Sequence, residues 1–143
     1  MIYLDSSALV KKYVKENGSE HVLGIVDKGE IMATSKLAYP EIYASLGRKR
    51  REKALTQKDY HSAVGDFESD WREFLIIEFQ DELLPLMKQL VWKHSLKGAD
   101  LVHLSSAIWI RKAAREKVVL VASDIQLLRA AKAEKIEIFN PEA

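Results

Sequence analysis

The 143-residue sequence contains no cysteine, which excludes disulfide bridges and metal sites built from thiolates. A chain without cysteine also suits a reducing compartment, where disulfides rarely form. Long apolar runs are missing as well. Asp5, Lys11 and Lys12 interrupt the apolar start, and no uncharged run approaches the roughly 18 residues of a membrane helix. We therefore expect a cytoplasmic protein that does not cross a membrane.

No charge of one sign dominates, since 22 Lys and Arg residues face 21 Asp and Glu residues, for a net charge of +1. This balance excludes the overall basic field of many nucleic-acid-binding proteins, but it leaves room for a local basic patch. Internal repeats, low-complexity tracts and linkers are also absent. With 48% hydrophobic and 30% charged residues, the composition is typical of a globular protein, and we expect residues 1–143 to form a single domain.

Short apolar segments alternate with segments of helical spacing along the chain. The expected strands cover residues 2–4, 31–34, 75–79, 118–122 and 136–139. This alternation predicts an α/β fold with a mainly parallel central sheet of four or five strands flanked by helices. Two helical patterns between about residues 56 and 96 are interpreted as a helical-pair insertion. Pro40 is expected to kink or restart the helix that opens at Ser35.

Acidic residues stand where several of these strands end. Asp5 and Asp124 each occupy a strand-to-helix junction. Glu41 lies near the start of the helix after the second strand, and Asp100 starts a helix after a tight turn. Because ligands of open parallel sheets bind beyond the carboxyl ends of the strands, we expect all four side chains at one edge of the sheet.

Four neighbouring carboxylates would repel one another and drive at least one of them to protonate. A divalent cation relieves this repulsion, and oxygen-only ligands favour Mg²⁺ or Mn²⁺ over zinc. Each residue alone has a structural explanation: Asp5 and Asp124 as helix caps, Asp100 as a partner of a helix dipole, and Glu41 as a solvated residue. Their joint placement favours a metal site.

Four stretches of the sequence resemble the motifs of PIN-domain nucleases, and the length is most similar to VapC-type toxins of toxin–antitoxin pairs. In chain order they are IYLDSSALVKKY, AYPEIYASL, LKGADLVHLSSA and LVASDIQLLRAA. The resemblance extends from about Ile2 to Phe139 and implies a three-layer PIN-like fold. It also implies Mg²⁺- or Mn²⁺-dependent hydrolysis of phosphodiester bonds in RNA, a homodimer, and a small antitoxin whose tail fills the acidic groove.

The resemblance assigns roles to residues that match the motifs. Catalytic and metal-binding roles fall on Asp5, Glu41, Asp100 and Asp124, supported by the hydroxyls of Ser6 and Ser123. Many relatives carry arginine three residues before the third aspartate, whereas this chain has Lys97. Lysine keeps the charge but loses the bidentate geometry of arginine in contacts to phosphate or antitoxin.

Two residues are candidates for contacts with the substrate, and each of them has two interpretations. Arg48, in the basic run RKRREK, lies seven residues after Glu41 on nearly the same helix face and could extend the site toward an RNA backbone. It could equally belong to a solvated helix end. His103 could touch substrate through the face it shares with Asp100, or be a core histidine with satisfied hydrogen bonds.

Two alternative functions are compatible with parts of the pattern. A non-catalytic PIN-like binding module would have the same fold, although it would be expected to have lost an acidic position. A receiver-type phosphoacceptor domain also gathers acidic residues and Mg²⁺ at strand ends. It would need an aspartate after a central strand and a lysine after a late one, whereas this chain has Glu41 and the Ser123-Asp124 pair.

Overall fold

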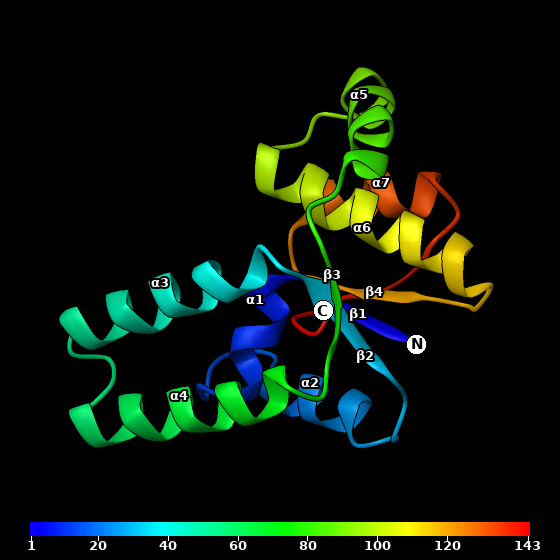
Figure 1. The fold of residues 1–143 in the computed structure, drawn as a ribbon. Coiled ribbons are helices and arrows are strands. Elements are labelled where there is room, and N and C mark those ends of the chain that lie inside the picture. The colour runs from blue at the N-terminus through cyan, green and yellow to red at the C-terminus, as the bar shows by residue number, and fades with distance from the viewer.

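A five-stranded, fully parallel sheet forms the centre of the computed structural model, which describes residues 1–143 (Figure 1). Its strands are β1 (Ile2–Leu4), β2 (Met32–Ser35), β3 (Leu75–Ile77), β4 (Val119–Val121) and β5 (Glu137–Phe139). They lie in the order β3-β2-β1-β4-β5, so the first strand of the chain is the middle one. The α/β fold class and the strand positions are confirmed: β1 has its predicted range, and each of the other four strands is slightly shorter than or shifted from its own.

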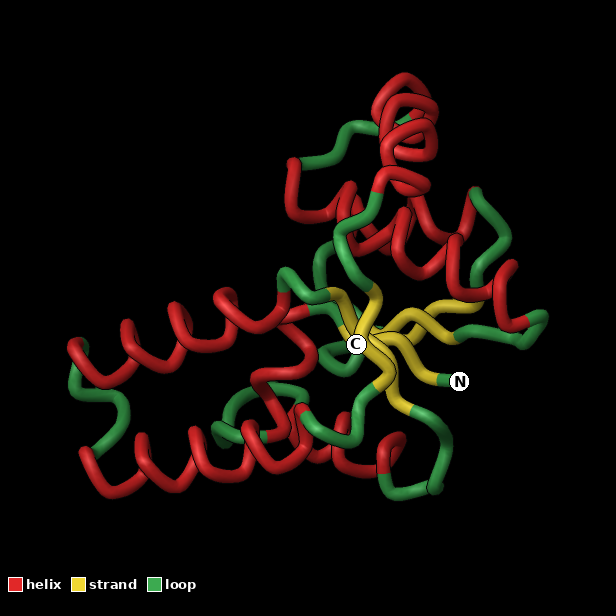
Figure 2. The backbone as a smooth tube through the Cα atoms, in the orientation of Figure 1, coloured by secondary structure: helices red, strands yellow, loops and turns green.

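Seven helices cover the sheet on both faces (Figure 2). They are α1 (Ser6–Leu9), α2 (Ser19–Val26), α3 (Ala38–Arg51), α4 (Gln57–Trp71), α5 (Leu84–Lys93), α6 (Gly98–Ala114) and α7 (Ile125–Ala133). Short 3₁₀ turns follow α1 at Val10–Lys12 and precede α5 at Asp81–Leu83. None of the helices is both long enough and apolar enough to span a bilayer.

The alternation of side chains along β1 divides the core into two halves. Tyr3 faces one half together with Leu104 of α6 and Leu120 of β4. Ile2 and Leu4 face the other half, which α1 to α4 cover (Figure 1). Successive residues of a strand point to opposite faces of the sheet, so a fully buried strand needs apolar residues at every position. The three residues of β1 meet this requirement, which explains their place at the centre of three layers.

The region between residues 56 and 96 differs in one respect from the predicted helical pair. Strand β3 divides it, so α4 packs beside α3 on one face of the sheet while α5 packs beside α6 on the other (Figure 1). The helical pair that projects from the sheet is α3 with α4. Pro40 neither kinks nor restarts a helix, because α3 begins at Ala38 and its first turn tolerates a residue without an N–H group.

Candidate active site at the carboxyl edge of the sheet

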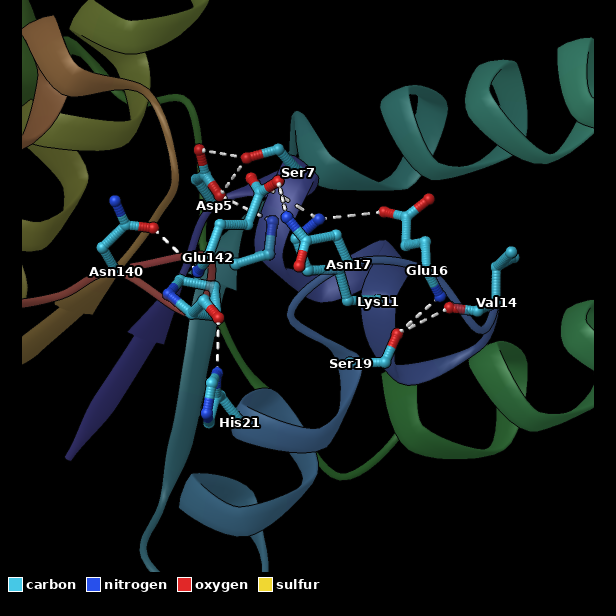
Figure 3. A network of polar contacts seen from close by, with 12 residues as sticks. Asp5, Ser7, Lys11, Val14, Glu16, Asn17, Ser19, His21, Asn140 and Glu142 are labelled. Atoms are coloured by element: carbon cyan, nitrogen blue, oxygen red, sulfur yellow. Dashed lines mark hydrogen bonds and ion pairs between the residues drawn. The ribbon is translucent and has the colours of Figure 1, made fainter.

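Asp5 follows β1 directly and caps the helix that comes next. Its Oδ1 accepts a hydrogen bond from the backbone N–H of Ala8 at 2.9 Å, and the Ser7 hydroxyl donates to both carboxylate oxygens at 2.9 and 3.0 Å (Figure 3). The residue is 5% exposed. Burial raises the pKa of Asp5 above its usual range, against the opposing effects of His103, Ala8 and Ser7. The local structure thus holds the Asp5 carboxylate in a buried position that disfavours its ionised form.

Glu41 reaches the same edge from the first turn of α3. Its Oε1 accepts a hydrogen bond from the Ser6 hydroxyl and lies 2.8 Å from Nε2 of His103. Burial favours the protonated form, but the hydrogen bonds from His103 and Ser6 outweigh it and lower the pKa of Glu41 below its usual range. Glu41 is therefore a carboxylate that its neighbours keep ionised.

His103 is buried in α6 and joins three elements. Its Nδ1 lies 2.8 Å from the hydroxyl of Tyr3 in β1, while Nε2 faces Glu41 of α3. An ionised carboxylate can only accept, so Nε2 carries the proton and donates to Glu41, and in the neutral ring Nδ1 accepts from Tyr3. Both ring nitrogens are thereby engaged inside the protein, which is the arrangement of the core-histidine interpretation. Contact with substrate stays a prediction.

Asp100 and Asp124 complete the acidic edge. The Asp124 carboxylate caps α7 by accepting from the backbone N–H of Leu127 at 3.0 Å. Asp100 lies in the first turn of α6. Burial raises the pKa of Asp100, and repulsion from the charges of Asp124 and Asp5 raises it further. Glu41 likewise raises the pKa of Asp5. Charge effects therefore connect Glu41 to Asp5, and Asp5 and Asp124 to Asp100.

The chemistry of these donors fits a hard divalent cation. Carboxylate oxygens are the ligands of Mg²⁺ and Mn²⁺, and mutual repulsion disfavours the ionised state of Asp100 without a cation. The buried hydroxyl of Ser123, adjacent to Asp124, has no hydrogen-bond partner within the protein, which a hydrated ion would supply. No set of three or more acidic or imidazole side chains stands at direct ligating geometry, so the assignment of metal ligands stays a prediction.

A hollow of about 430 Å³ adjoins the acidic edge. Glu41 and Arg48 both line it, so the seven-residue spacing does place both on one face of α3. The complete lining consists of Ser6, Ser7, Val10, Lys11, Glu16, Glu41, Ala44, Ser45, Arg48 and Lys49. A larger hollow of about 620 Å³ lies at the opposite edge, beside Met1 and Lys117, and contains none of the acidic cluster. Cavity size alone does not identify the site.

Sequence reasoning missed three contributors to this region. Tyr3 was expected only as a strand residue, although a tyrosine in a buried strand signals a hydroxyl that needs a partner. Ser7 holds Asp5, and Lys11, a 6% exposed residue in the lining of the hollow, directs its ammonium group to Glu16 and Glu142 (Figure 3). Lys97 is exposed just before α6, and its charge lowers the pKa of Asp100 against the larger effect of burial.

The ion pairs of Glu16 predict an acid-dependent part of the protein's stability. Burial favours protonated Glu16, but hydrogen bonds from Lys49 and Lys11 outweigh it and lower its pKa. A lowered folded pKa gives stability that is fully present above the unfolded value of about 4.3 and is lost as pH falls through the folded value. As the pH falls from 7 to 3, the free energy of unfolding measured in urea should therefore decrease more for wild type than for Glu16→Gln. The exposed Glu20→Gln should behave as wild type, and parallel curves for all three would contradict the assignment.

Comparison with known proteins gives a family match and several structural neighbours. The sequence model of one family, the PIN domain, matches residues 2–133. Ribonuclease VapC45 of Mycobacterium tuberculosis is 37% identical over 112 residues, which are 76% of this chain and 75% of the relative. Two solved structures share the fold. One is a toxin–antitoxin complex from Klebsiella pneumoniae, which has a TM-score of 0.67 at 13% identity, and the match covers 99% of this chain and 98% of the Klebsiella chain. VapBC2 from Rickettsia felis, bound to a promoter DNA fragment, has a TM-score of 0.65 at 20% identity over 98% of both chains.

Proposed function

Because this chain belongs to the PIN domain family, we propose that it is a ribonuclease of the VapC type that hydrolyses phosphodiester bonds in RNA with the help of Mg²⁺ or Mn²⁺. The four motifs that resemble PIN-domain nucleases all lie within the matched region. The observation that carries the proposal is the placement of Asp5, Asp100 and Asp124 at the carboxyl edge of one sheet, where burial and the charges of Asp124 and Asp5 raise the pKa of Asp100. Such a cluster of carboxylates is expected where a divalent cation and a phosphate have to meet.

In the proposed site Asp5, Asp100 and Asp124, with Glu41, would hold the cation. When bound, the cation supplies charge neutralisation at the scissile phosphate and activation of a water nucleophile. Ser7 and the N–H of Ala8 keep the Asp5 carboxylate in one orientation. His103 and Ser6 do the same for Glu41 and keep it ionised. No ionisable side chain other than the carboxylates is needed to accept a proton from water.

The expected partners follow from the same family membership. We propose an RNA substrate, a small antitoxin such as the partner in the Klebsiella complex, and a second copy of this chain in a cytoplasmic homodimer. Apolar side chains of α5 remain exposed, among them Val91 and Trp92, and Trp92 has 90% of its surface accessible. Exposed apolar groups on one helix support self-association. Light scattering of the purified chain measures it, and a monomer at all concentrations would contradict the homodimer.

Cleavage of a labelled RNA panel tests the proposed activity. We expect wild type to cut at least one RNA internally in the presence of Mg²⁺ or Mn²⁺, and to lose this activity in excess chelator. Activity should return when either ion is added beyond the chelator. Cleavage that persists in chelator would contradict the metal dependence. If no RNA is cut while the RNA is bound, the non-catalytic binding module is favoured instead.

A further inference from the structure

A buried lysine beside the acidic edge has no role in the activity proposed above. Lys11 lies in the 3₁₀ turn after α1, and only 6% of the residue is exposed. Lys11 belongs to the lining of the hollow together with Ser6, Ser7 and Glu41. A buried ammonium group is costly unless it is paired with anions. Here the pairing is with Glu16 at 3.1 Å and with Glu142, in the C-terminal tail, at 3.7 Å (Figure 3).

Glu16 connects this lysine to the basic end of α3. One carboxylate oxygen of Glu16 lies 3.1 Å from Nζ of Lys11, and the other lies 3.0 Å from Nζ of Lys49. A single carboxylate between two ammonium groups leaves a positive charge and fixes the positions of both amines. The hydrogen bonds that Glu16 accepts lower its pKa, so this bridge is ionised at neutral pH. The wall of the hollow therefore presents two ammonium groups in fixed positions, of which that of Lys11 also pairs with Glu142.

Arg48 and Ser45 extend this wall along α3. Arg48 is exposed and takes part in none of the ion pairs of the structure, so its guanidinium is available to a ligand. The lining residues include three cations, Lys11, Arg48 and Lys49, and two anions, Glu16 and Glu41, while Glu142 outside the lining balances the remaining charge as long as it pairs with Lys11. Hydroxyl groups of Ser7 and Ser45 lie on the same lining. Guanidinium, ammonium and hydroxyl donors around one hollow match the oxygens of a phosphate group.

We propose that this hollow is a subsite for a phosphodiester group of the RNA strand that flanks the bond being cut, an inference that rests on the ribonuclease function proposed above. Seven residues of α3 between Glu41 and Arg48 correspond to about 10 Å along the helix, which is too far for one phosphate to reach both ends. A phosphate at Arg48 and Lys49 is therefore a neighbour of the scissile one. The subsite holds the strand in line while the acidic edge acts on the adjacent linkage.

The C-terminal tail already places an anionic oxygen against this wall. Glu142 receives a hydrogen bond from Asn17 at 3.2 Å, and the carbonyl of Pro141 accepts one from His21 at 2.7 Å (Figure 3). The tail thereby stays beside α2 with its carboxylate facing Lys11. The contact of 3.7 Å between Lys11 and Glu142 is the longer of the two ion pairs of Lys11, so it is the one that an entering phosphate replaces. Glu142 thus competes with RNA for the same cation.

RNA binding by matched variants tests the subsite. We would follow fluorescence anisotropy of a labelled single-stranded 12-mer RNA in chelator, where the strand is not cut, at several salt concentrations. Arg48→Gln and Lys49→Gln should each weaken binding about tenfold and lower the salt slope by about one. Arg51→Gln is the control, because Arg51 is exposed on the same helix but lines a different hollow with Gly47 and Arg50. It should change affinity less than twofold, whereas Glu142→Gln should tighten binding two- to threefold.

Two results would overturn the subsite. Equal losses in Arg48→Gln and Arg51→Gln would show a diffuse basic surface in place of a defined site. Competition by polyglutamate as strong as by unlabelled RNA would show that the hollow takes acidic protein segments instead. Hydrolysis of bis(p-nitrophenyl) phosphate, a small diester without a flanking phosphate, separates the two proposals. Arg51→Gln, which lies outside the proposed subsite, should leave that reaction unchanged. A wild type inactive on both substrates would defeat the ribonuclease function while the binding results still decide the subsite.

Discussion

Asp5→Asn is expected to lower the rate of RNA cleavage at least about hundredfold while leaving the fold intact. Loss of one negative charge from a cation site removes several kcal/mol of stabilisation, and every 1.36 kcal/mol is a factor of ten in rate. The amide oxygen of asparagine can still accept from the N–H of Ala8 and from the hydroxyl of Ser7, so the cap of α1 persists. Because burial already raises the pKa of Asp5, the neutral amide also relieves a cost to folding.

Cleavage rates and urea unfolding, measured on the same preparations, separate the effect of Asp5→Asn on activity from its effect on stability. Asp81→Asn provides a control with the same chemical change, since Asp81 is exposed in the 3₁₀ turn before α5. This control should keep wild-type activity. Asp5→Asn should unfold no earlier than wild type, so a loss of activity cannot be attributed to misfolding. Undiminished cleavage by Asp5→Asn would remove Asp5 from the active site.

Phe67→Ala should destabilise the protein by about 3–5 kcal/mol, the usual cost of emptying a fully buried phenylalanine site. Phe67 of α4 is completely buried, and its ring centroid lies 5.5 Å from that of Trp71 and 5.7 Å from that of Tyr39. The rings of Tyr13 and Tyr43 lie at 5.5 and 6.0 Å. Aromatic pairs of this kind add to the burial of apolar area. The substitution therefore removes the packing that joins α4 to α3.

The loss of packing between α4 and α3 should also disturb the candidate active site, because Tyr39 and Tyr43 flank Glu41 in the sequence of α3. Both tyrosines also donate hydrogen bonds of 2.7 Å to Glu68 of α4. Phe79→Ala is the matched control, since Phe79 is 58% exposed and its removal should change the free energy of unfolding by no more than about 1 kcal/mol. Urea unfolding of both variants measures the difference. A cost for Phe67→Ala as small as that for Phe79→Ala would contradict the packing argument.

The acidic edge could be predicted from the sequence because the argument needs only local information. Asp5 and Asp124 each follow a strand, and parallel strands end at a common edge whatever their order in the sheet. The helical spacing that joins Glu41 to Arg48 is local as well, and the structure places both on one hollow. Whether these residues bind metal and RNA is a matter for the experiments above.

Other features depend on contacts that no local pattern carries. The helices α4 and α5 were predicted as one pair because the spacing of apolar residues does not tell which face of a sheet a helix covers. Strand β3 between them is short and begins with a 38% exposed Leu75, so its signal was weak. Tyr3 and His103 are a hundred positions apart in the sequence. Lys11 pairs with Glu142, which lies near the opposite end of the chain.

The central position of β1 has a consequence for synthesis on the ribosome. Ile2, Tyr3 and Leu4 pair with Val119, Leu120 and Val121 of β4, so the first strand acquires its second neighbour only after almost the whole chain has been translated. Pairings this distant in sequence are slow to form, since a long loop has to close first. Asp5 and Asp124 consequently meet only in the finished polypeptide. Under the ribonuclease function proposed above, a nascent chain still attached to its messenger RNA would therefore lack the complete acidic edge that cleavage of that messenger requires.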